Sequence, residues 1–249
     1  MRPIRYAAIA LASLLAVQSA TPAWAKTGPV DYAAIVAAPQ RNADNRALDE
    51  ARAPAAVLAF SGIKPGDTVA DYSAGGGYYS ELIADLVGPK GRVLALGSPR
   101  FYKADVWDKL TALHPNIVPI VSTNFDLAPR SVDVIFTHLV FHDLFVRPKP
   151  GEAGVDASRV IANWYAAVKP GGYVIVADHR ASAGDVAEIA GTLHRIDPEI
   201  AKSAMLDAGF VLDDESDVLH RSDDSGELRV FDPQIRGKTD RFLLRFRRP

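Results

Sequence analysis

The chain contains no cysteine, which excludes disulfides, thiolate metal sites and a cysteine nucleophile. It also lacks an excess of charge, because 28 basic residues stand against 30 acidic ones and the formal net charge is −2. A global basic field that would recruit nucleic acid or an anionic membrane is therefore not expected. Apolar residues make up 48% of the 249, and no internal repeat is visible, so a folded globular chain is indicated rather than a disordered or repetitive one.

Residues 1–25 have the pattern of a secretory signal peptide. Two arginines precede an apolar run of eleven residues at 7–17, and an A-x-A cleavage pattern ends at Ala25. Eleven residues form a helix of about 16 Å, roughly half of a bilayer core, so a cleaved signal explains the segment better than a permanent anchor. We expect export to the periplasm and a mature chain without a stable membrane anchor. That chain would begin at Lys26 with 26 basic and 30 acidic residues, a net charge of −4.

Strand-like and helix-like stretches alternate along most of the remaining sequence. This order predicts βαβ units with right-handed crossovers and a largely parallel, doubly wound, Rossmann-like α/β sheet that is covered on both faces. The expected strands are 68–71, 92–96, 117–121, 132–137 and 173–177, and the expected helices between and after them are 79–86, 103–113 and 159–168.

The last part of the chain lacks this alternation. After residue 212 a polar stretch at 213–229 leads to an alternating basic and apolar run at 241–246. We expect a C-terminal antiparallel hairpin here, with the arginines of 241–246 protecting an edge strand by their charge. The segment 223–226 is expected to be a mobile loop.

Residues 26–60 are expected to form a helical extension ahead of the main domain at 61–249. The charged residues between Arg41 and Arg52 are spaced so that several share a helical face. Two interpretations follow from this pattern: a solvated, ion-paired helix, or a lid that packs over the loop after the first strand.

That loop, DYSAGGGYY at residues 71–79, is rich in glycine. Glycines let the backbone turn sharply and let a ligand approach main-chain amides closely. In a doubly wound sheet the first crossover is also a place where ligands bind. The alternatives are a tight turn without a ligand, and a dinucleotide site. The dinucleotide pattern would require Gly or Ala at Ser80 and a ribose-binding acid about 20 residues on, and neither is present.

Several motifs follow one another in a fixed order along the chain. They are the charged pattern from Arg41 to Arg52, Asp71, Gly75 and Gly77, Phe141-His142-Asp143-Leu144, Lys169-Pro170-Gly171-Gly172, Asp178-His179 and His194-Arg195-Ile196-Asp197. Taken together, these ordered motifs resemble the class I S-adenosylmethionine-dependent methyltransferases, and more narrowly a bacterial group of exported predicted methyltransferases. The resemblance covers residues 31–249. It implies a seven-stranded sheet with one antiparallel strand, S-adenosylmethionine as cofactor and methyl transfer to a small-molecule acceptor.

The resemblance also implies where the cofactor would bind. Asp71 would lie under the zwitterionic amino acid end, and the loop would close on that end through its backbone. The residues assigned to this part of the site are Asp71, Ser73, Gly75, Gly77 and Tyr78.

The adenosine end is less well supported. Asn124 and Asp126 follow the third strand, where family members contact the adenine, but the same residues also suit a plain polar turn. Gly97 stands where the family has an acid that accepts hydrogen bonds from both ribose hydroxyls. Losing that acid would weaken binding, with Ser98 or a water as a partial substitute.

Histidines and acids follow the fourth and fifth strands and recur in the next helical segment. Because the carboxyl ends of parallel strands line one crevice, these groups can converge. They could supply a general base, bind a divalent metal or satisfy backbone groups. We take His142, with Asp143 beside it, as the catalytic candidate and assign no metal ligand, since no tight ligand spacing is present.

A rival function is that of a non-catalytic exported binding or scaffold protein that keeps the methyltransferase fold. Gly97 favours this alternative, as does export to a compartment where the cofactor is not obviously supplied. The intact glycine loop and the polar groups at the strand ends favour the enzyme. Fold alone does not decide between them.

Overall fold

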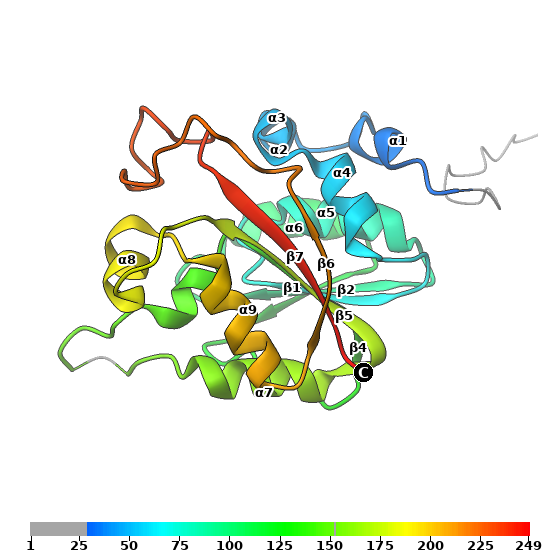
Figure 1. Cartoon of the computed structure of the whole chain (residues 1–249). Helices are drawn as coiled ribbons and strands as arrows, with labels where there is room; N and C mark the ends of the chain where they lie inside the picture. The colour runs from blue at the N-terminus through cyan, green and yellow to red at the C-terminus, as the bar shows by residue number, and fades with distance from the viewer. Residues whose placement is uncertain (1–28, 152) are drawn as a thin grey trace, which may run out of the picture.

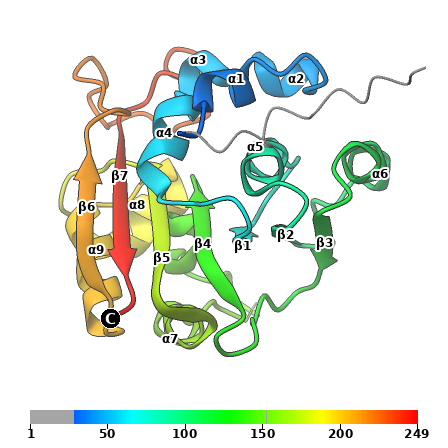
Figure 2. The same cartoon turned by 90° about the vertical axis from the view of Figure 1, so that its right-hand side faces the viewer.

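The computed structural model describes residues 29–151 and 153–249, so the expected signal segment at 1–25 lies outside the described residues. Seven strands form one sheet (Figure 1), and Figure 2 shows their order, β3-β2-β1-β4-β5-β7-β6. The strands are β1 (Thr68–Tyr72), β2 (Arg92–Gly97), β3 (Ile117–Val121), β4 (Val132–His138), β5 (Val168–His179), β6 (Val211–Ser216) and β7 (Arg241–Arg247). The helices are α1 (Tyr32–Val36), α2 (Ala43–Arg46), α3 (Asp49–Arg52), α4 (Pro54–Ser61), α5 (Tyr78–Val87), α6 (Ala104–Leu113), η2 (Phe141–Phe145), α7 (Ala157–Ala167), α8 (Val186–Leu193) and α9 (Pro198–Asp207).

Strands β1 to β5 are mutually parallel, and β7 runs antiparallel to both of its neighbours, β5 and β6. The expected seven-stranded, mostly parallel sheet with one antiparallel strand is therefore confirmed. None of the helices in the described ranges is long and apolar enough to cross a membrane.

The expectation that β7 is an edge strand is wrong. β7 lies between β5 and β6, and four of its residues, Phe242, Leu243, Leu244 and Phe246, are buried in the core. Its arginines have specific partners: Arg245 Nε donates to Asp213 Oδ2 of β6 at 2.7 Å, and the Arg241 guanidinium donates to the main-chain oxygen of Ala51. The exposed edge is β6, which carries the acidic side chains.

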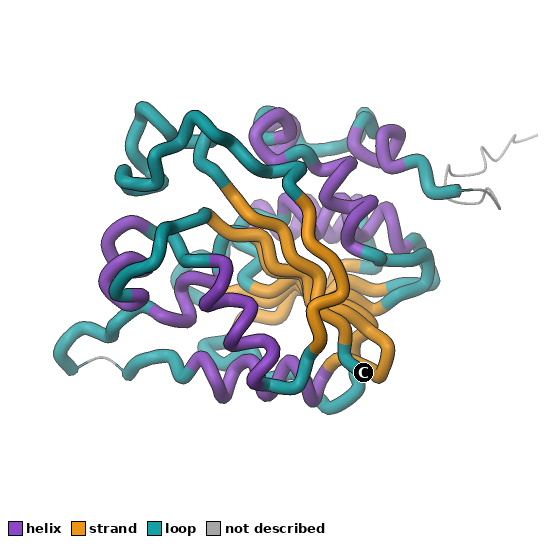
Figure 3. Tube along the Cα trace, viewed as in Figure 1, coloured by secondary structure: helices purple, strands orange, loops and turns teal. Residues whose placement is uncertain are grey.

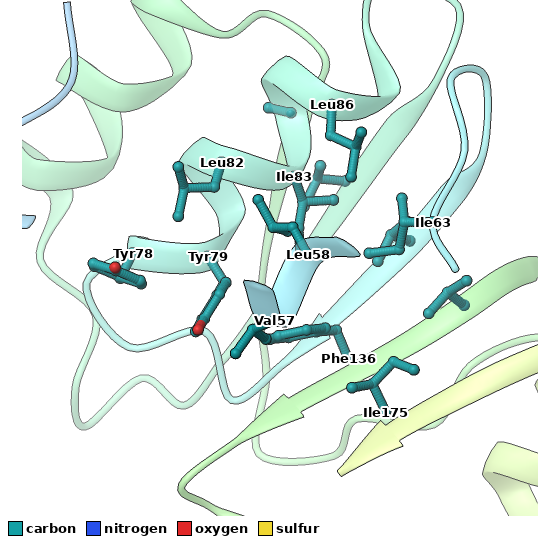
Figure 4. Packing of buried hydrophobic residues seen from close by; sticks show 14 of the residues in the cluster. Val57, Leu58, Ile63, Tyr78, Tyr79, Leu82, Ile83, Leu86, Phe136 and Ile175 are labelled. Carbon is teal, nitrogen blue, oxygen red and sulfur yellow. The ribbon is translucent and has the colours of Figure 1, made fainter. Parts of the chain in front are cut away.

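The sheet is covered on both faces, and Figure 2 shows α4, α5 and α6 on one face and α7 and α9 on the other. Alternation along the strands sends neighbouring side chains to opposite cores. In β5, Ile175 faces α4 and α5, whereas Val174 and Val176 face α7 and α9. Figure 4 shows the first core, where Tyr79, Leu82, Ile83 and Leu86 of α5 pack against α4 and the sheet.

The charged segment before α4 packs on α5 and is not a solvated helix. Glu81 of α5 is fully buried, and its carboxylate accepts hydrogen bonds from Asn42 N at 2.8 Å, Asn45 Nδ2 at 3.0 Å and Arg41 Nε at 3.4 Å. Arg41 is itself buried and makes a second ion pair with Asp49 at 2.7 Å. These bonds hold α2 and α3 beside the start of α5, next to the glycine loop.

The segment 217–240 between β6 and β7 passes over the carboxyl end of the sheet, as the long loop of Figure 3 shows. The expectation of a mobile loop at 223–226 is wrong, because the Asp224 carboxylate is buried in an ion pair with Arg195. Arg195 Nη1 lies 2.7 Å from Asp224 Oδ2, and both side chains are at most 1% exposed. A further bond, from Arg195 Nε to Leu228 O at 3.1 Å, fixes the same segment.

Candidate functional site

A cavity of about 520 Å³ opens at the carboxyl ends of β1, β4 and β5, within the size range of small-molecule sites. A second cavity of about 210 Å³ adjoins it and extends to Gly97 at the end of β2. The two share Ser73, Gly75, Phe101, Val140 and Asp143. The sequence-predicted residues that line the first cavity are Asp71, Ser73, Gly75, Tyr78, His142 and Asp143.

The glycine loop bends through left-handed backbone at three positions. Ser73, Gly75 and Gly77 have φ of +60°, +57° and +78°, and Ala74 N bonds to Leu96 O at 2.8 Å, which ties the loop to β2. A Cβ at Gly75 would meet nothing within 4 Å, so this glycine faces open cavity. A Cβ at Gly77 would lie 2.5 Å from Leu110 Cδ2, so Gly77 is required by packing against α6.

Three non-glycine residues with positive φ line the first cavity. They are Ser73 at +60°, Leu139 at +62° and His194 at +57°. Each left-handed residue with a side chain costs about 1–2 kcal/mol relative to ordinary backbone. Such residues gather at binding and catalytic sites, where the surrounding structure holds them in place. Their grouping at one cavity is independent support for a functional site there.

Asp71, at the end of β1, supplies a buried carboxylate to this cavity. Its side chain is 4% exposed, and Ser80 Oγ donates to Asp71 Oδ2 at 2.5 Å. Burial raises the pKa of Asp71 to about 6, against the lowering effect of the Ser80 hydrogen bonds and the Arg52 charge. The group is therefore ionised at neutral pH and suits a cationic ligand group.

Arg52, which sequence reasoning did not assign to the site, also lines the cavity. Its guanidinium carbon lies 4.2 Å from the centre of the Tyr78 ring, a cation–π arrangement. The Tyr78 hydroxyl donates to Asp49 Oδ1 at 2.7 Å, so its proton is already engaged within the protein. The sequence did single out Arg52, but only as the last residue of the charged pattern that begins at Arg41.

His142 is held by Asp178, the residue before the end of β5. Asp178 accepts from the His142 main-chain amide at 2.8 Å and lies 2.9 Å from its Nδ1. Because a carboxylate only accepts, Nδ1 carries the proton and Nε2 of the neutral ring has a free lone pair. Burial alone would lower the pKa of His142, but the charge and hydrogen bond of Asp178, with a contribution from Asp143, raise it above its ordinary value.

The Nε2 atom of His142 faces two groups. Asp143 Oδ1 lies 3.3 Å away on a side chain that is 56% exposed, and His194 Nδ1 also lies 3.3 Å away. Arg229 Nη2 lies 3.2 Å from His194 Nε2, and a guanidinium is always a donor. With both rings neutral, Arg229 therefore donates to His194 Nε2, His194 Nδ1 donates to His142 Nε2, and His142 Nδ1 donates to Asp178.

This order bears on the metal interpretation. His142, Asp143 and His194 offer ligand atoms within 4.8 Å of one another. A metal would need the lone pair of His194 Nδ1, which requires the proton to move to Nε2 and the contact with Arg229 to break. As they stand, the hydrogen bonds account for His142 and His194, while Asp143 Oδ1 lies 3.3 Å from His142 Nε2.

Two further histidines line the cavity in neutral form. Burial lowers the pKa of His179 to about 3 and that of His138 well below its ordinary value, and the charge of Arg241 adds to both effects. His179 Nδ1 pairs with Thr239 Oγ1 at 2.7 Å. Among the residues described, His138 Nε2 has no hydrogen-bond partner. These rings do not carry positive charge into the cavity.

No protein-family model and no curated protein matches the chain. Solved structures do match. An S-adenosylmethionine-dependent methyltransferase of Aquifex aeolicus aligns with a TM-score of 0.56 and 20% identity over 87% of this chain and 98% of its own. An S-adenosylmethionine-dependent methyltransferase of Mesorhizobium loti aligns with a TM-score of 0.56 and 14% identity over 81% of this chain and 100% of its own. The chain has the class I methyltransferase fold. At these identities the likeness concerns the fold.

In the methyltransferase fold of this chain, Gly97 ends β2 at the second cavity. A side chain built on it would meet nothing within 4 Å, and its φ is not in the left-handed region. Apolar side chains, among them Tyr102, Trp107 and Pro119, line the same cavity, together with Ser98. Position 97 therefore has room for a Cβ at the edge of this cavity, although the chain has no acid there.

Asn124 and Asp126 lie outside both cavities. Asn124 Nδ2 donates to Asp126 Oδ2 at 2.8 Å, and Arg159 Nη1 lies 3.0 Å from the same oxygen. All three side chains are exposed or partly so, and their bonds are those of a polar turn. The structure does not bring them to the loop residues, and their contact with an adenine stays a prediction.

Proposed function

We propose that the protein transfers a methyl group from S-adenosylmethionine to a small-molecule acceptor. The observation that carries this proposal is the position of the buried, ionised Asp71 beside the left-handed glycine loop, in a cavity at the carboxyl edge of a methyltransferase-fold sheet. Fold alone supports many functions, whereas this carboxylate and loop fit one end of the cofactor.

The residues present fit both ends of a sulfonium nucleoside. Asp71 suits the ammonium group of the methionine end, and the open space over Gly75 admits close approach to main-chain amides. The adjoining cavity, lined by Tyr102 and Trp107, suits the adenosine. The bound cofactor supplies an activated methyl group on a good leaving group, so the work left to the chain is chiefly alignment.

His142 would act on the acceptor. In the neutral ring Nε2 carries no proton, and His142 lines the cavity, so an acceptor hydroxyl or amine that takes the place of the His194 donor can give its proton to that atom. Asp178 then holds the positively charged ring through the bond to Nδ1. Asp143 and His194 flank the same nitrogen and can orient the acceptor.

The alternative is a binding protein that keeps the fold and has lost catalysis. One observation favours it: Gly97 supplies no hydrogen-bonding side chain where the ribose would lie. Cofactor affinity decides between the two candidates.

The deciding experiment is calorimetry of the mature chain with S-adenosylmethionine and with its demethylated product, compared with Asp71→Asn. We expect micromolar binding to the wild type and a loss of at least tenfold in affinity in the variant.

The Asp71→Asn variant should also be more stable than the wild type above about pH 6, by about 2–3 kcal/mol, because the wild type must bury a charge there. Below about pH 4 both carry a neutral side chain and the gain should vanish. No heat from the wild type at millimolar ligand would overturn the enzyme in favour of a binding protein for another ligand.

We also propose that the chain is exported. The support is the sequence of residues 1–25, with its positive start, apolar run and A-x-A end. N-terminal sequencing of protein from the periplasmic fraction should begin at Lys26. An intact Met1 terminus in a cytosolic product would contradict this.

A further inference from the structure

We infer that Arg52 and Asp71 together form a zwitterion site, in which the guanidinium binds the carboxylate and Asp71 binds the ammonium of a ligand's amino acid group. This inference rests on the proposed function, because that ligand group is the methionine end of the cofactor. It adds a binding residue from α3, outside the glycine loop.

The first step is that Arg52 has no counter-ion of its own. Its nearest carboxylate on α3, Asp49, is already engaged by both terminal nitrogens of Arg41, at 2.7 and 3.0 Å, and by the Tyr78 hydroxyl. Within 29–151 and 153–249, Arg52 takes part in no ion pair with any acid. Burial lowers the pKa of Arg52, as expected for a partly desolvated cation that lacks a direct partner.

The second step is that Asp71 stands opposite. Arg52 and Asp71 both line the first cavity, and each shifts the pKa of the other through its charge. They form no direct ion pair, and both side chains line the same cavity. Two opposite charges that face one space match a group with a positive and a negative end.

The third step is the surroundings of the guanidinium. Arg241, 4% exposed, has a pKa lowered to about 10, chiefly by burial and next by the charge of Arg52, so the two cations lie near each other. Its hydrogen bonds go to neutral oxygens, Ala51 O and Thr239 Oγ1. Tyr79 and His138, which line the same cavity, are neutral at pH 7. This end of the cavity is therefore positive and attracts an anion.

The orientation of Arg52 is set before any ligand arrives. The cation–π contact holds the guanidinium over the Tyr78 ring, and the Tyr78 hydroxyl is fixed in turn by its hydrogen bond to Asp49. A guanidinium presents paired donors that match the two oxygens of a carboxylate, which a lysine ammonium does not. We therefore expect Lys at this position to restore only part of the affinity.

The experiment is calorimetry with two ligands that share the nucleoside. S-adenosylhomocysteine carries the amino acid group, and methylthioadenosine lacks it. Arg52→Met should weaken S-adenosylhomocysteine at least tenfold and change methylthioadenosine less than twofold. Arg52→Lys should lie between wild type and Arg52→Met. The matched control is Arg46→Met, an exposed arginine of the neighbouring helix α2, which should change neither.

A third ligand tests the pairing without relying on the variant. Decarboxylated S-adenosylhomocysteine keeps the ammonium for Asp71 and removes the partner of Arg52. It should bind the wild type as weakly as S-adenosylhomocysteine binds Arg52→Met, and Arg52→Met should weaken it no further.

The outcomes separate the two proposals. Unchanged affinity for S-adenosylhomocysteine in Arg52→Met, or an equal loss for both nucleosides, overturns the zwitterion site while cofactor binding stands. Absence of binding of all three ligands to the wild type overturns the proposed function, and the zwitterion site with it. Thermal melting of each variant shows whether the fold is kept. If Arg52→Met does not fold, the decarboxylated ligand tests the site on the wild type alone, and affinity equal to that of S-adenosylhomocysteine would overturn it.

Discussion

Asp178 accepts hydrogen bonds from both the main-chain amide and the ring of His142, at 2.8 and 2.9 Å. One carboxylate thus fixes the position of the backbone and the tautomer of the ring together. Asp178 is fully buried, and although burial would raise its pKa, the charge and hydrogen bonds of His142 hold it below its ordinary value. At pH values between the lowered pKa of Asp178 and the raised pKa of His142, the two side chains therefore form an ion pair.

Replacing Asp178 should alter His142 in a measurable way. In Asp178→Asn we expect the pKa of His142, followed by NMR of its ring protons, to fall by at least one unit, because the charge that raises it is gone. A control, Asp143→Asn, should lower it less, since that side chain is more exposed. An unchanged His142 pKa in Asp178→Asn would show that Asp178 does not set its protonation.

The same variant should lose stability in a pH-dependent manner. The pKa of His142 is raised, so its contribution is fully present below about pH 6.5 and is lost as pH rises through the folded value. The pKa of Asp178 is lowered, so its contribution is present above about pH 4 and is lost in stronger acid. Denaturant unfolding should show a loss of about 3 kcal/mol near pH 6 and a smaller loss near pH 9. A loss independent of pH would contradict this assignment.

Alanine substitutions at two glycines of the loop should distinguish a role in packing from a role in ligand binding. Gly77→Ala places a methyl group 2.5 Å from Leu110 in left-handed backbone, and we expect a loss of about 2–4 kcal/mol. Gly75→Ala has free space and should cost about 1 kcal/mol from the backbone alone. Its cofactor affinity should fall, because the methyl group points into the cavity. Equal stability losses in the two variants would mean that contact with α6 does not matter.

Restoring the missing acid should strengthen ligand binding. Gly97→Asp introduces an acceptor into open space, and we expect affinity for S-adenosylhomocysteine to rise about tenfold or more, from hydrogen bonds to a charged group worth about 1.5–3 kcal/mol each. Gly97→Asn is the neutral control and should gain less. A cofactor analogue without ribose hydroxyls should gain nothing from either change. Affinity that stays the same in Gly97→Asp would show that the ribose lies elsewhere.

The packing of α2 and α3 on α5 depends on Glu81. Glu81→Leu removes the acceptor of Asn42 N and Asn45 Nδ2 and leaves Arg41 with Asp49 alone. We expect a loss of about 2–4 kcal/mol and faster amide hydrogen exchange in residues 42–52. The exposed Glu50 offers the control, Glu50→Gln, which should change neither measurement.

The sheet could be predicted from the sequence because its parallel strands are short apolar runs separated by helices. The observed β3, 117–121, has the expected bounds, β1 is longer than expected by one residue at its end, and α5 is longer by one residue at each end. The position of β7 could not be predicted, since local sequence does not say whether an amphipathic strand is inserted between two others. That depends on partners such as Asp213, which is distant in sequence.

The site divides in the same way. Convergence of Asp71, His142 and Asp143 follows from parallel topology, which brings strand ends to one edge. The position of Arg52 at the cavity could not be predicted, because a charged helix is ordinarily solvated. Only the burial of Glu81 shows that this one packs against the protein. The left-handed backbone of His194, which aims its ring at His142, has no local signal.

The segment between β6 and β7 supplies Arg229, Val230 and Phe231 to the rim of the cavity, yet belongs to neither strand. It is held to the body by Arg195 rather than by pairing in the sheet. Its length and composition can therefore drift over evolutionary time without shifting strand register. In the proposed enzyme, selectivity for the acceptor could therefore change without altering the residues proposed to bind the nucleoside.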